Sequence, residues 1–156
     1  MSVHVATISW TRQEQVFLDN RYSRSHEWRF DGGSVVHASS APTSAPVPLS
    51  DVTAVDPEEA FVATLSSCHM LWFLSIAAKR GFVVDSYLDE AEGILEMGAD
   101  GRVSITKVHL RPRVRIVGTR RPDHSQFEAL HHEAHDRCFI ANSVKTDVRC
   151  EAVLET

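Results

Sequence analysis

The sequence predicts an α+β fold, in which strands before and after a long apolar helix pack around it. Three observations support this prediction. A nearly uninterrupted apolar run covers residues 60–78, and segments typical of strands lie on both sides of it. A second helical pattern, amphipathic this time, covers residues 125–139 and is followed by one more strand-like segment. The predicted order is therefore strands, long helix, strands, second helix, strand.

The first third of the chain is predicted to be β-structure. Residues 3–8 alternate in a way that suits a strand packed on both faces. Two further strands, His26 to Phe30 and Ser34 to Ala38, flank the turn sequence Asp31-Gly32-Gly33 and should form a hairpin. Residues 39–48 are rich in Ser, Ala and Pro, which predicts an extended loop.

The long helix has clear start and stop signals. Asp56 is a suitable N-cap, Pro57 fits the first turn, and Glu59 completes a capping box. Gly81 should stop the helix after about Arg80. A helix that is apolar on all faces needs cover on all sides, which one short chain hardly offers. This favours a homodimer in which the long helices of two subunits share one interior.

The second half of the chain alternates between strands and turns. Strands are expected at residues 88–97 and 103–117, on either side of a Gly-rich turn at 98–101, and at 147–154. Pro112 indicates an edge position or a bulge in the second of these strands. The second helix should cover residues 125–139.

The composition restricts the class of protein. A chain of 156 residues with 43% apolar residues fits one domain, residues 1–156, with a real core. The formal charge of -5, with no basic block, argues against nucleic acid as a partner. Three cysteines and no recognisable signal peptide predict a reducing compartment, the cytoplasm. No membrane is expected, because Ser66 to His69 place polar groups at the centre of the apolar run.

Two cysteines are candidates for chemistry. Cys68 lies in the middle of the long helix, and Cys138 shares one face of the second helix with Phe127, Leu130 and Ala134. Both should therefore point inward. A buried free cysteine is usually only a small core residue, and a disulfide would need the two Cα atoms within about 7 Å. Cys150 is interpreted as structural, since it shares a strand face with Ala152 and Leu154.

Two facing cysteines suggest the hypothesis of a thiol peroxidase. Such an enzyme needs a thiolate, a cation that stabilises it and the departing alkoxide, and a second thiol that condenses with the sulfenic acid. Arginine suits the cation, and a carboxylate can hold it in place. Glu58 is a candidate carboxylate, although it also suits the helix dipole. Ten residues of helix would separate Glu58 from Cys68 by about 15 Å. The helix must therefore start late, an arginine must bridge the two residues, or the partner subunit must supply the carboxylate.

A metal site is the alternative hypothesis. His131 and His135 lie one helical turn apart, and Cys138 follows three residues later, so that all three can face one side. Cys68 or His69 could supply a fourth ligand from the long helix. The alternative function is therefore a zinc- or ligand-binding protein without peroxidase activity.

The segment Asp-Pro-Glu-Glu-Ala-Phe-Val-Ala-Thr-Leu-Ser-Ser-Cys-His at 56–69 resembles the first cysteine motif of the OsmC/Ohr family, the osmotically inducible and organic-hydroperoxide-resistance proteins. Asp56 replaces the family's Asn, while Glu58 keeps the family's spacing to Cys68. The segment from His135 to Asn142 resembles the second motif, with Phe139 in place of the usual Pro. The predicted strand order agrees over nearly the whole chain.

The resemblance implies antiparallel sheets around a central helix, an intertwined homodimer, and a two-cysteine peroxidase of the oxidative stress response. Cys68 would attack an organic hydroperoxide, Cys138 would close a disulfide, and a dithiol reductant such as a lipoylated protein would reopen it. No cofactor or metal is implied for this step. The family supplies the activating arginine from the N-terminal β region, where this chain has Arg21, Arg24 and Arg29. Arg24 has the spacing before Gly32-Gly33 that the hydroperoxide-resistance branch implies, and Arg21 is the second choice.

Overall fold

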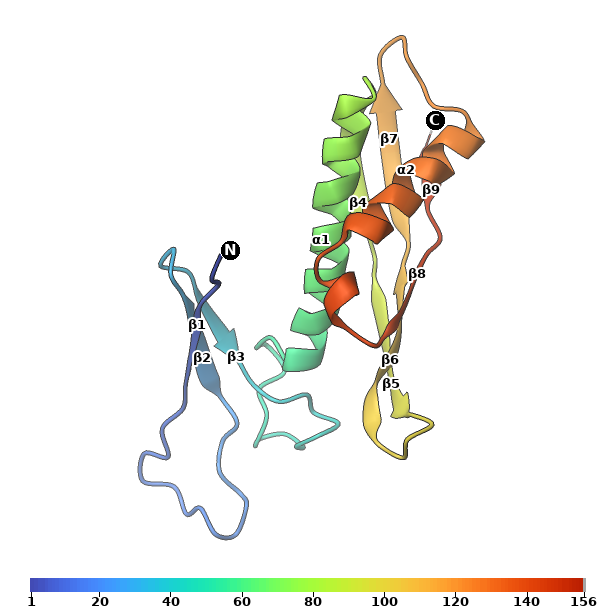
Figure 1. Cartoon of the computed structure of the whole chain (residues 1–156). Helices are drawn as coiled ribbons and strands as arrows, with labels where there is room; N and C mark the ends of the chain where they lie inside the picture. Colours follow the sequence, from blue (N-terminus) through green and yellow to red (C-terminus); the bar gives the residue numbers. More distant parts are fainter. Residues whose placement is uncertain (156) are drawn as a thin grey trace. The chain divides into compact units, whose positions relative to one another are not determined.

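The computed structural model describes residues 1–155 and confirms the α+β class (Figure 1). The chain forms two compact units, residues 1–60 and residues 61 onward. The first unit contains three strands: β1 (Ala6–Ser9), β2 (His26–Phe30) and β3 (Val35–Ala38). The second contains most of the long helix and all later elements.

The first unit is built on an antiparallel sheet in the order β1-β2-β3. The predicted hairpin is confirmed, and Gly33 takes a φ of 88° at its turn, a conformation that favours glycine. The prediction that the first strand is packed on both faces is wrong for the single chain, because all of β1 is exposed. Its apolar residue Ile8 is exposed, and so are Val3 and Val5, which precede the strand. Residues 39–48 form the loop that their composition predicts.

Helix α1 (Pro57–Lys79) begins at the predicted cap. The Glu59 amide donates to Asp56 Oδ1 at 2.7 Å, and the Asp56 amide donates to Glu59 Oε2 at 3.2 Å. These two bonds form the capping box that the sequence predicts. Gly81, with a φ of 79°, follows the C-terminus.

Only one face of α1 is covered within the chain. Its buried residues are Leu65, His69, Phe73, Ile76 and Ala77, while Leu71 is 61% exposed. The expectation of burial on all sides is therefore not met in the single chain. By length and composition α1 could cross a membrane, a property that it shares with core helices of soluble proteins.

The second unit contains two mixed sheets of three strands, β4-β7-β9 and β5-β6-β8. The strands are β4 (Val83–Asp89), β5 (Glu92–Met97), β6 (Val103–Leu110), β7 (Pro112–Val117), β8 (Asp147–Cys150) and β9 (Val153–Glu155). Strand β4 pairs antiparallel with β7, as β5 does with β6, whereas β6·β8 and β7·β9 are parallel. The antiparallel pairs agree with the expectation of antiparallel sheets, and the two parallel pairs are an addition to it.

Each long strand predicted in this unit is broken into two. The breaks lie together at one corner, where the Arg111 amide donates to the Asp89 carboxylate at 2.6 Å and the Glu151 amide donates to the Leu110 carbonyl at 2.9 Å. At this corner the chain passes from one sheet to the other. Pro112 begins β7, the central strand of its sheet, so the predicted edge position is wrong. Its missing N–H is tolerated because it is the first residue of the strand.

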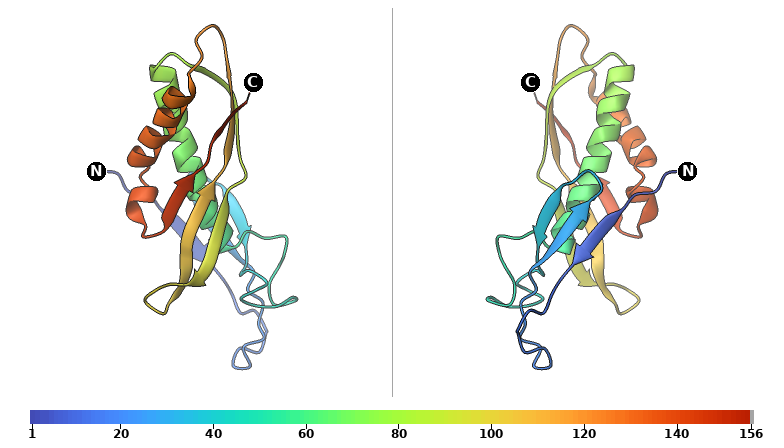
Figure 2. Two further views of the ribbon diagram at one scale, coloured as in Figure 1. Left: turned by 90° about the vertical axis from the view of Figure 1, so that its right-hand side faces the viewer. Right: turned by 90° about the vertical axis from the view of Figure 1, so that its left-hand side faces the viewer.

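Helix α2 (His124–Arg137) starts at Asp123, where a capping box with Gln126 fixes the first turn. The short 3-10 helix η1 (Ala141–Ser143) follows it. Both long helices lie on the same side of the strands of the second unit (Figures 1 and 2). Between helices and strands lies the main core, which consists of Phe73, Ile76, Ala77, Phe82, Val114, Ile116, Phe127, Leu130 and Ala134.

Candidate functional site

Cys68 lies beside the buried stripe of α1. Its side chain is half-buried and its thiol is free. His69, the next residue, is only 1% exposed and belongs to the buried stripe. The positions agree with helical geometry, because consecutive residues point about 100° apart around the axis. Cys68 therefore has one side toward the core and the other toward solvent.

Cys138 is the C-cap of α2, not a residue of its last turn as the sequence suggested. Its backbone is extended, with φ -66° and ψ 108°, and its side chain is 1% exposed. The Ala141 amide donates to Cys138 Sγ at 3.4 Å. The predicted inward face is confirmed, because Phe127, Leu130 and Ala134 are buried together with Cys138. This cap turns the chain from α2 into η1 and fixes the position of the sulfur.

The Cys68 and Cys138 thiols are close neighbours. Burial is the main cause that raises the pKa of Cys138 to about 11; the hydrogen bond from Ala141 acts against it, and the adjacent Cys68 thiol acts in the same direction as burial. Cys138 is therefore protonated at neutral pH. A peroxide in this region would meet a half-buried sulfur at Cys68 and a buried, protonated one behind it.

Aromatic side chains from the middle of α1 and from the segment just after α2 pack together beside the cysteines. Trp72, one turn after Cys68 on α1, makes an edge contact with Phe139 at a centroid distance of 5.4 Å. The Arg137 guanidinium lies over the Trp72 ring at 5.7 Å. Phe139 takes the place of the Pro expected from the second motif and is itself largely exposed. The segment after α2 is thus tied to α1 through one aromatic pair next to the sulfurs.

Glu58 occupies the first turn of α1, as predicted. The helix is continuous from Pro57, so it does not start late and about 15 Å of helix separates Glu58 from Cys68. Of the three arrangements considered from sequence, a bridging arginine and a carboxylate from the partner subunit are left. Within residues 1–155, the Glu58 carboxylate has no ion-pair partner.

The three candidate arginines have different surroundings in the first unit. Arg29 pairs with Glu27 at 2.6 Å. The Arg24 guanidinium lies 3.8 Å from the centre of the Tyr22 ring and donates to the Tyr22 and Asn20 carbonyls and to the Asn20 side chain. No carboxylate within residues 1–155 pairs with the Arg24 guanidinium. Arg21 is exposed, and its backbone amide donates to Asp19 Oδ1.

A largely apolar cavity of about 480 Å³ lies beside Arg24 within residues 1–60. An aromatic group forms one wall, in which Phe17 stacks on Tyr22 at 4.7 Å and Trp10 meets Tyr22 edge-on at 5.2 Å. The lining residues are Ile8, Trp10, Phe17, Tyr22, Arg24, His26, Ser39, Ser40 and Pro57. Such a cavity suits an apolar molecule with one negative or hydrogen-bonding end.

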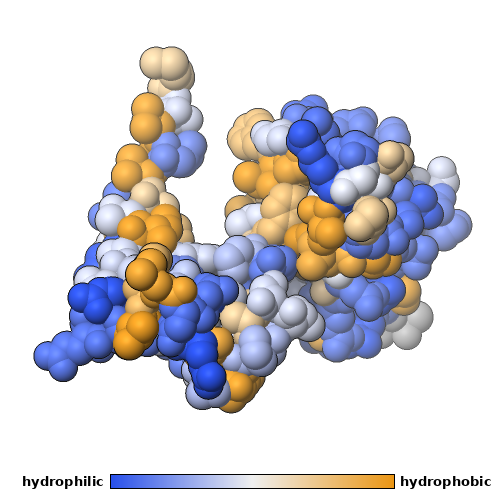
Figure 3. All heavy atoms as spheres, turned by 90° about the horizontal axis from the view of Figure 1, so that it is seen from below, coloured by the Kyte–Doolittle hydropathy of each residue, from blue (hydrophilic) through white to orange (hydrophobic). Residues whose placement is uncertain are grey.

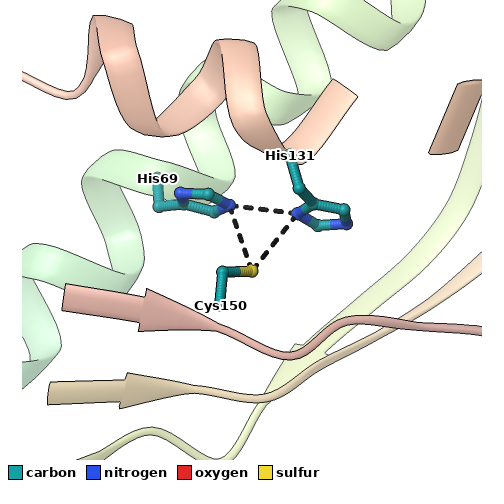
Figure 4. A group of neighbouring side chains, drawn as sticks. All are labelled: His69, His131 and Cys150. Atoms are coloured by element: carbon teal, nitrogen blue, oxygen red, sulfur yellow. Dashed lines mark hydrogen bonds between the residues drawn. The ribbon is translucent and has the colours of Figure 1, made fainter. Parts of the chain in front are cut away.

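A second group of ligand-type side chains lies in the core of the second unit. His69 from α1, His131 from α2 and Cys150 from β8 point toward one another (Figure 4). The distance from His69 Nε2 to His131 Nδ1 is 3.0 Å, and Cys150 Sγ lies 3.7 Å and 3.6 Å from these two nitrogens. This is the one group of three potential metal-binding side chains within residues 1–155.

The two imidazoles of this group are neutral at pH 7. Burial, with the charge of His135 as the second cause, lowers the pKa of His69 to about 4. Burial likewise lowers the pKa of His131 to about 3, with His69 as the second cause. Burial also raises the pKa of Cys150 to about 12, helped by Asp89 and Glu151.

The ligand set proposed from sequence differs from this arrangement. His131 turns toward His69 and Cys150, whereas His135 is only half-buried and does not belong to the group. Cys138 is next to Cys68 instead. The sequence interpretation also missed the role of Cys150, because 81 residues separate it from His69 and no local pattern connects them.

Comparison with known proteins finds a matching family model and several structures with this fold. The model of the family of OsmC-like proteins matches residues 50–153. The structure of an OsmC-like protein of unknown function from Vibrio cholerae is similar, with 56% sequence identity, a TM-score of 0.96, and coverage of 98% of this chain and 100% of that one. No curated protein matches the sequence.

More distant structures share the fold alone. One is an organic hydroperoxide resistance protein OsmC from Legionella pneumophila, with 15% identity, a TM-score of 0.66, and coverage of 100% of this chain and 98% of that one. Another is the organic hydroperoxide resistance protein OhrB of Bacillus subtilis, with 17% identity, a TM-score of 0.64, and coverage of 99% and 98%.

Proposed function

Because the chain belongs to the family of OsmC-like proteins, we propose that it is a thiol-dependent peroxidase that reduces organic hydroperoxides to alcohols. The observation that carries the proposal is the pair of neighbouring free thiols, Cys68 half-buried and Cys138 fully buried. The organic hydroperoxide resistance proteins of Legionella pneumophila and Bacillus subtilis have the same fold, which supports this substrate class. Each subunit would act as a single OsmC-like domain in the cytoplasm.

In the first step, the Cys68 thiolate attacks the outer oxygen of the hydroperoxide. The O–O bond breaks, its electron pair leaves with the alkoxide, and the alkoxide takes a proton to become the alcohol. Cys68 becomes a sulfenic acid. Cys68 is the attacking sulfur because it is the more accessible of the two and because Cys138, with a pKa near 11, is protonated.

In the second step, Cys138 condenses with the sulfenic acid. A Cys68–Cys138 disulfide forms and one water molecule leaves, so that the net oxidation stops before sulfinic acid. Cys138 sits at a helix cap followed by η1, where the chain can adjust without unfolding a helix turn. A dithiol reductant, such as a lipoylated protein, then reduces the disulfide by two thiol–disulfide exchanges.

Activation of Cys68 is assigned to Arg24. Its guanidinium, whose fork of donors suits a departing alkoxide, lies beside an apolar cavity that suits the organic part of a hydroperoxide. Glu58 would hold that guanidinium in the assembled enzyme, because a carboxylate is the strongest partner for it. Glu58 is too far along α1 to contact Cys68 of its own chain, so its role is to position the arginine.

A homodimer would cover the apolar surface that the single chain leaves open. Figure 3 shows apolar side chains at the surface of both units. Val3, Val5 and Ile8 of the first unit and Leu71 of α1 are exposed. Together with the half-covered helix α1, these residues support an assembly of two subunits, in which the active site includes parts of both.

The zinc-binding alternative built on Cys68, Cys138, His131 and His135 has less support. His131 is turned to other partners, and Cys138 is next to a thiol.

The experiment is a peroxidase assay with cumene hydroperoxide and a lipoyl dithiol. We expect Cys68→Ser to reduce the rate to background, because the nucleophile is lost. Ser67→Ala serves as the matched control on the preceding, exposed residue and should retain the wild-type rate within about twofold. A Cys68→Ser variant that consumes peroxide at the wild-type rate would falsify the proposal.

A further inference from the structure

We infer that His69, His131 and Cys150 form a binding site for a zinc-type divalent metal ion, separate from the Cys68–Cys138 pair. The three donor atoms are His69 Nε2, His131 Nδ1 and Cys150 Sγ, and they lie within 4.8 Å of one another. Two imidazole nitrogens and one thiolate are typical zinc ligands, and three protein ligands leave one coordination position open.

The distances between the donor atoms fit an ion. Zinc binds nitrogen at about 2.0–2.1 Å and sulfur at about 2.3 Å, so a tetrahedral ion holds two nitrogens about 3.3 Å apart and each nitrogen about 3.6 Å from the sulfur. The structure has 3.0 Å between the nitrogens and 3.6 Å and 3.7 Å from the sulfur to each of them. The two nitrogens must separate by about 0.3 Å. At least one ring must also turn, because 3.0 Å between the nitrogens and 5.3 Å between the ring centres place the nitrogens head to head, as in an N–H···N hydrogen bond.

The three side chains come from three elements that hold them in place. The His131 ring stacks on Phe73 at 4.2 Å and meets Phe127 edge-on at 4.8 Å, so it cannot turn away without losing both contacts. The His69 and His131 rings are nearly parallel, 8° apart, and are 1% and 5% exposed. An ion bound here would be shielded from water on most sides, which strengthens its attraction to the ligands.

The three donor atoms have no other polar partners within residues 1–155; each contacts only the other two. Around them, His69 Nδ1, His131 Nε2 and the Tyr87 hydroxyl are buried without a hydrogen-bond partner among the described residues. Buried polar atoms without partners are few in folded proteins. The three donor atoms therefore have no competing partner outside the group, whereas the three atoms around them would stay unpaired when an ion binds.

The charges are also suitable. On binding, the Cys150 thiol releases its proton to solvent, so a divalent ion with one thiolate and two neutral imidazoles has a net charge of about +1. Asp89 and Glu151 are close enough to act on Cys150 and would partly neutralise this charge. The site does not depend on the peroxidase proposal, because it uses neither Cys68 nor Cys138.

The test is metal binding by the untagged, chelator-treated full chain under reducing conditions. We expect one equivalent of Zn²⁺ per chain by elemental analysis. We also expect Co²⁺ to give the intense visible bands of a tetrahedral site, with a thiolate-to-cobalt charge-transfer band in the near-ultraviolet. Cys150→Ser should abolish that band, and His131→Gln should weaken Zn²⁺ binding by more than about 100-fold.

Two control variants separate this site from other possibilities. Cys68→Ser should keep the charge-transfer band, which distinguishes Cys150 from the peroxidase thiols, and His132→Gln should keep full binding although it removes an exposed histidine of the same helix. A circular dichroism spectrum identical to wild type shows that Cys150→Ser folds. The proposal is overturned if folded wild type does not bind the ion stoichiometrically. It is also overturned if Cys150→Ser and His131→Gln bind the ion as tightly as wild type does. Binding of copper but not of zinc or cobalt overturns the assignment of the ion.

Discussion

Acidification between pH 6.5 and 4.5 should destabilise the metal-free protein through its buried histidine pair. Burial lowers the pKa of His69 from 6.5 to about 4 and that of His131 from 6.5 to about 3. In the unfolded chain both imidazoles take up a proton near pH 6.5, whereas in the folded chain they stay neutral. Stability is therefore fully present above pH 6.5 and is lost as the pH falls toward the folded pKa values.

The magnitude follows from these pKa values. Each proton that is bound only by the unfolded state contributes a slope of about 1.4 kcal/mol per pH unit. Integrated for both histidines from pH 6.5 to 4.5, the loss in the free energy of unfolding is about 4 kcal/mol. This is a large part of the 5–15 kcal/mol that is typical of a domain, so acid should bring the protein close to unfolding.

Urea denaturation in the presence of a chelator, at intervals of half a pH unit, measures this loss. His131→Gln removes one of the two protons, and its slope should be about half that of the wild type. His132→Gln is the matched control, because His132 is exposed on the same helix and should leave the slope unchanged. Wild-type stability that is flat over this range, or a full slope in His131→Gln, would show that the buried histidine pair does not cause the loss.

Three further outcomes are expected. Gly93→Ala should lower the free energy of unfolding by about 1–3 kcal/mol in urea, since its Cβ would lie 2.5 Å from the Val62 side chain; Gly32→Ala, with open space around it, is the control. Cys138→Ser should accumulate the Cys68 sulfenic acid, seen by mass spectrometry as one added oxygen, and should over-oxidise with excess peroxide. Arg24→Lys should lower kcat/KM for cumene hydroperoxide by about 100-fold without changing thermal stability. Equal stability of the two glycine variants, a disulfide in Cys138→Ser, or unchanged kinetics in Arg24→Lys would each contradict the corresponding argument.

Local signals in the sequence were sufficient for the parts of the fold that local contacts determine. Asp56 and Glu59 predicted the start of α1 because a capping box involves residues only three positions apart. The turn at Asp31-Gly32-Gly33 predicted its hairpin for the same reason. The inward face of α2, including Cys138, followed from helical spacing.

Contacts between distant residues determine what the sequence did not show. The breaks at Asp89 and Arg111 depend on a hydrogen bond across 22 residues. The extended, alternating pattern of these strands is the same on both sides of each break. The parallel pairing of β8 and β9 likewise depends on where the chain returns after α2.

The candidate sites show the same division. The helical face of Cys138 and the cap before Glu58 could be predicted from sequence. The partners of His131 could not, because helical spacing to His135 and Cys138 is a local pattern, whereas the contacts with His69 and Cys150 join three elements. Cys150 was therefore interpreted as structural although it faces two imidazoles.

The central claim, that Cys68 and Cys138 form a redox pair, is tested most directly by counting thiols before and after one equivalent of cumene hydroperoxide. We expect two of the three thiols to disappear and peptide mapping to find a Cys68–Cys138 disulfide with Cys150 still free. Three thiols remaining after the peroxide has been consumed, or a disulfide that includes Cys150, would contradict it.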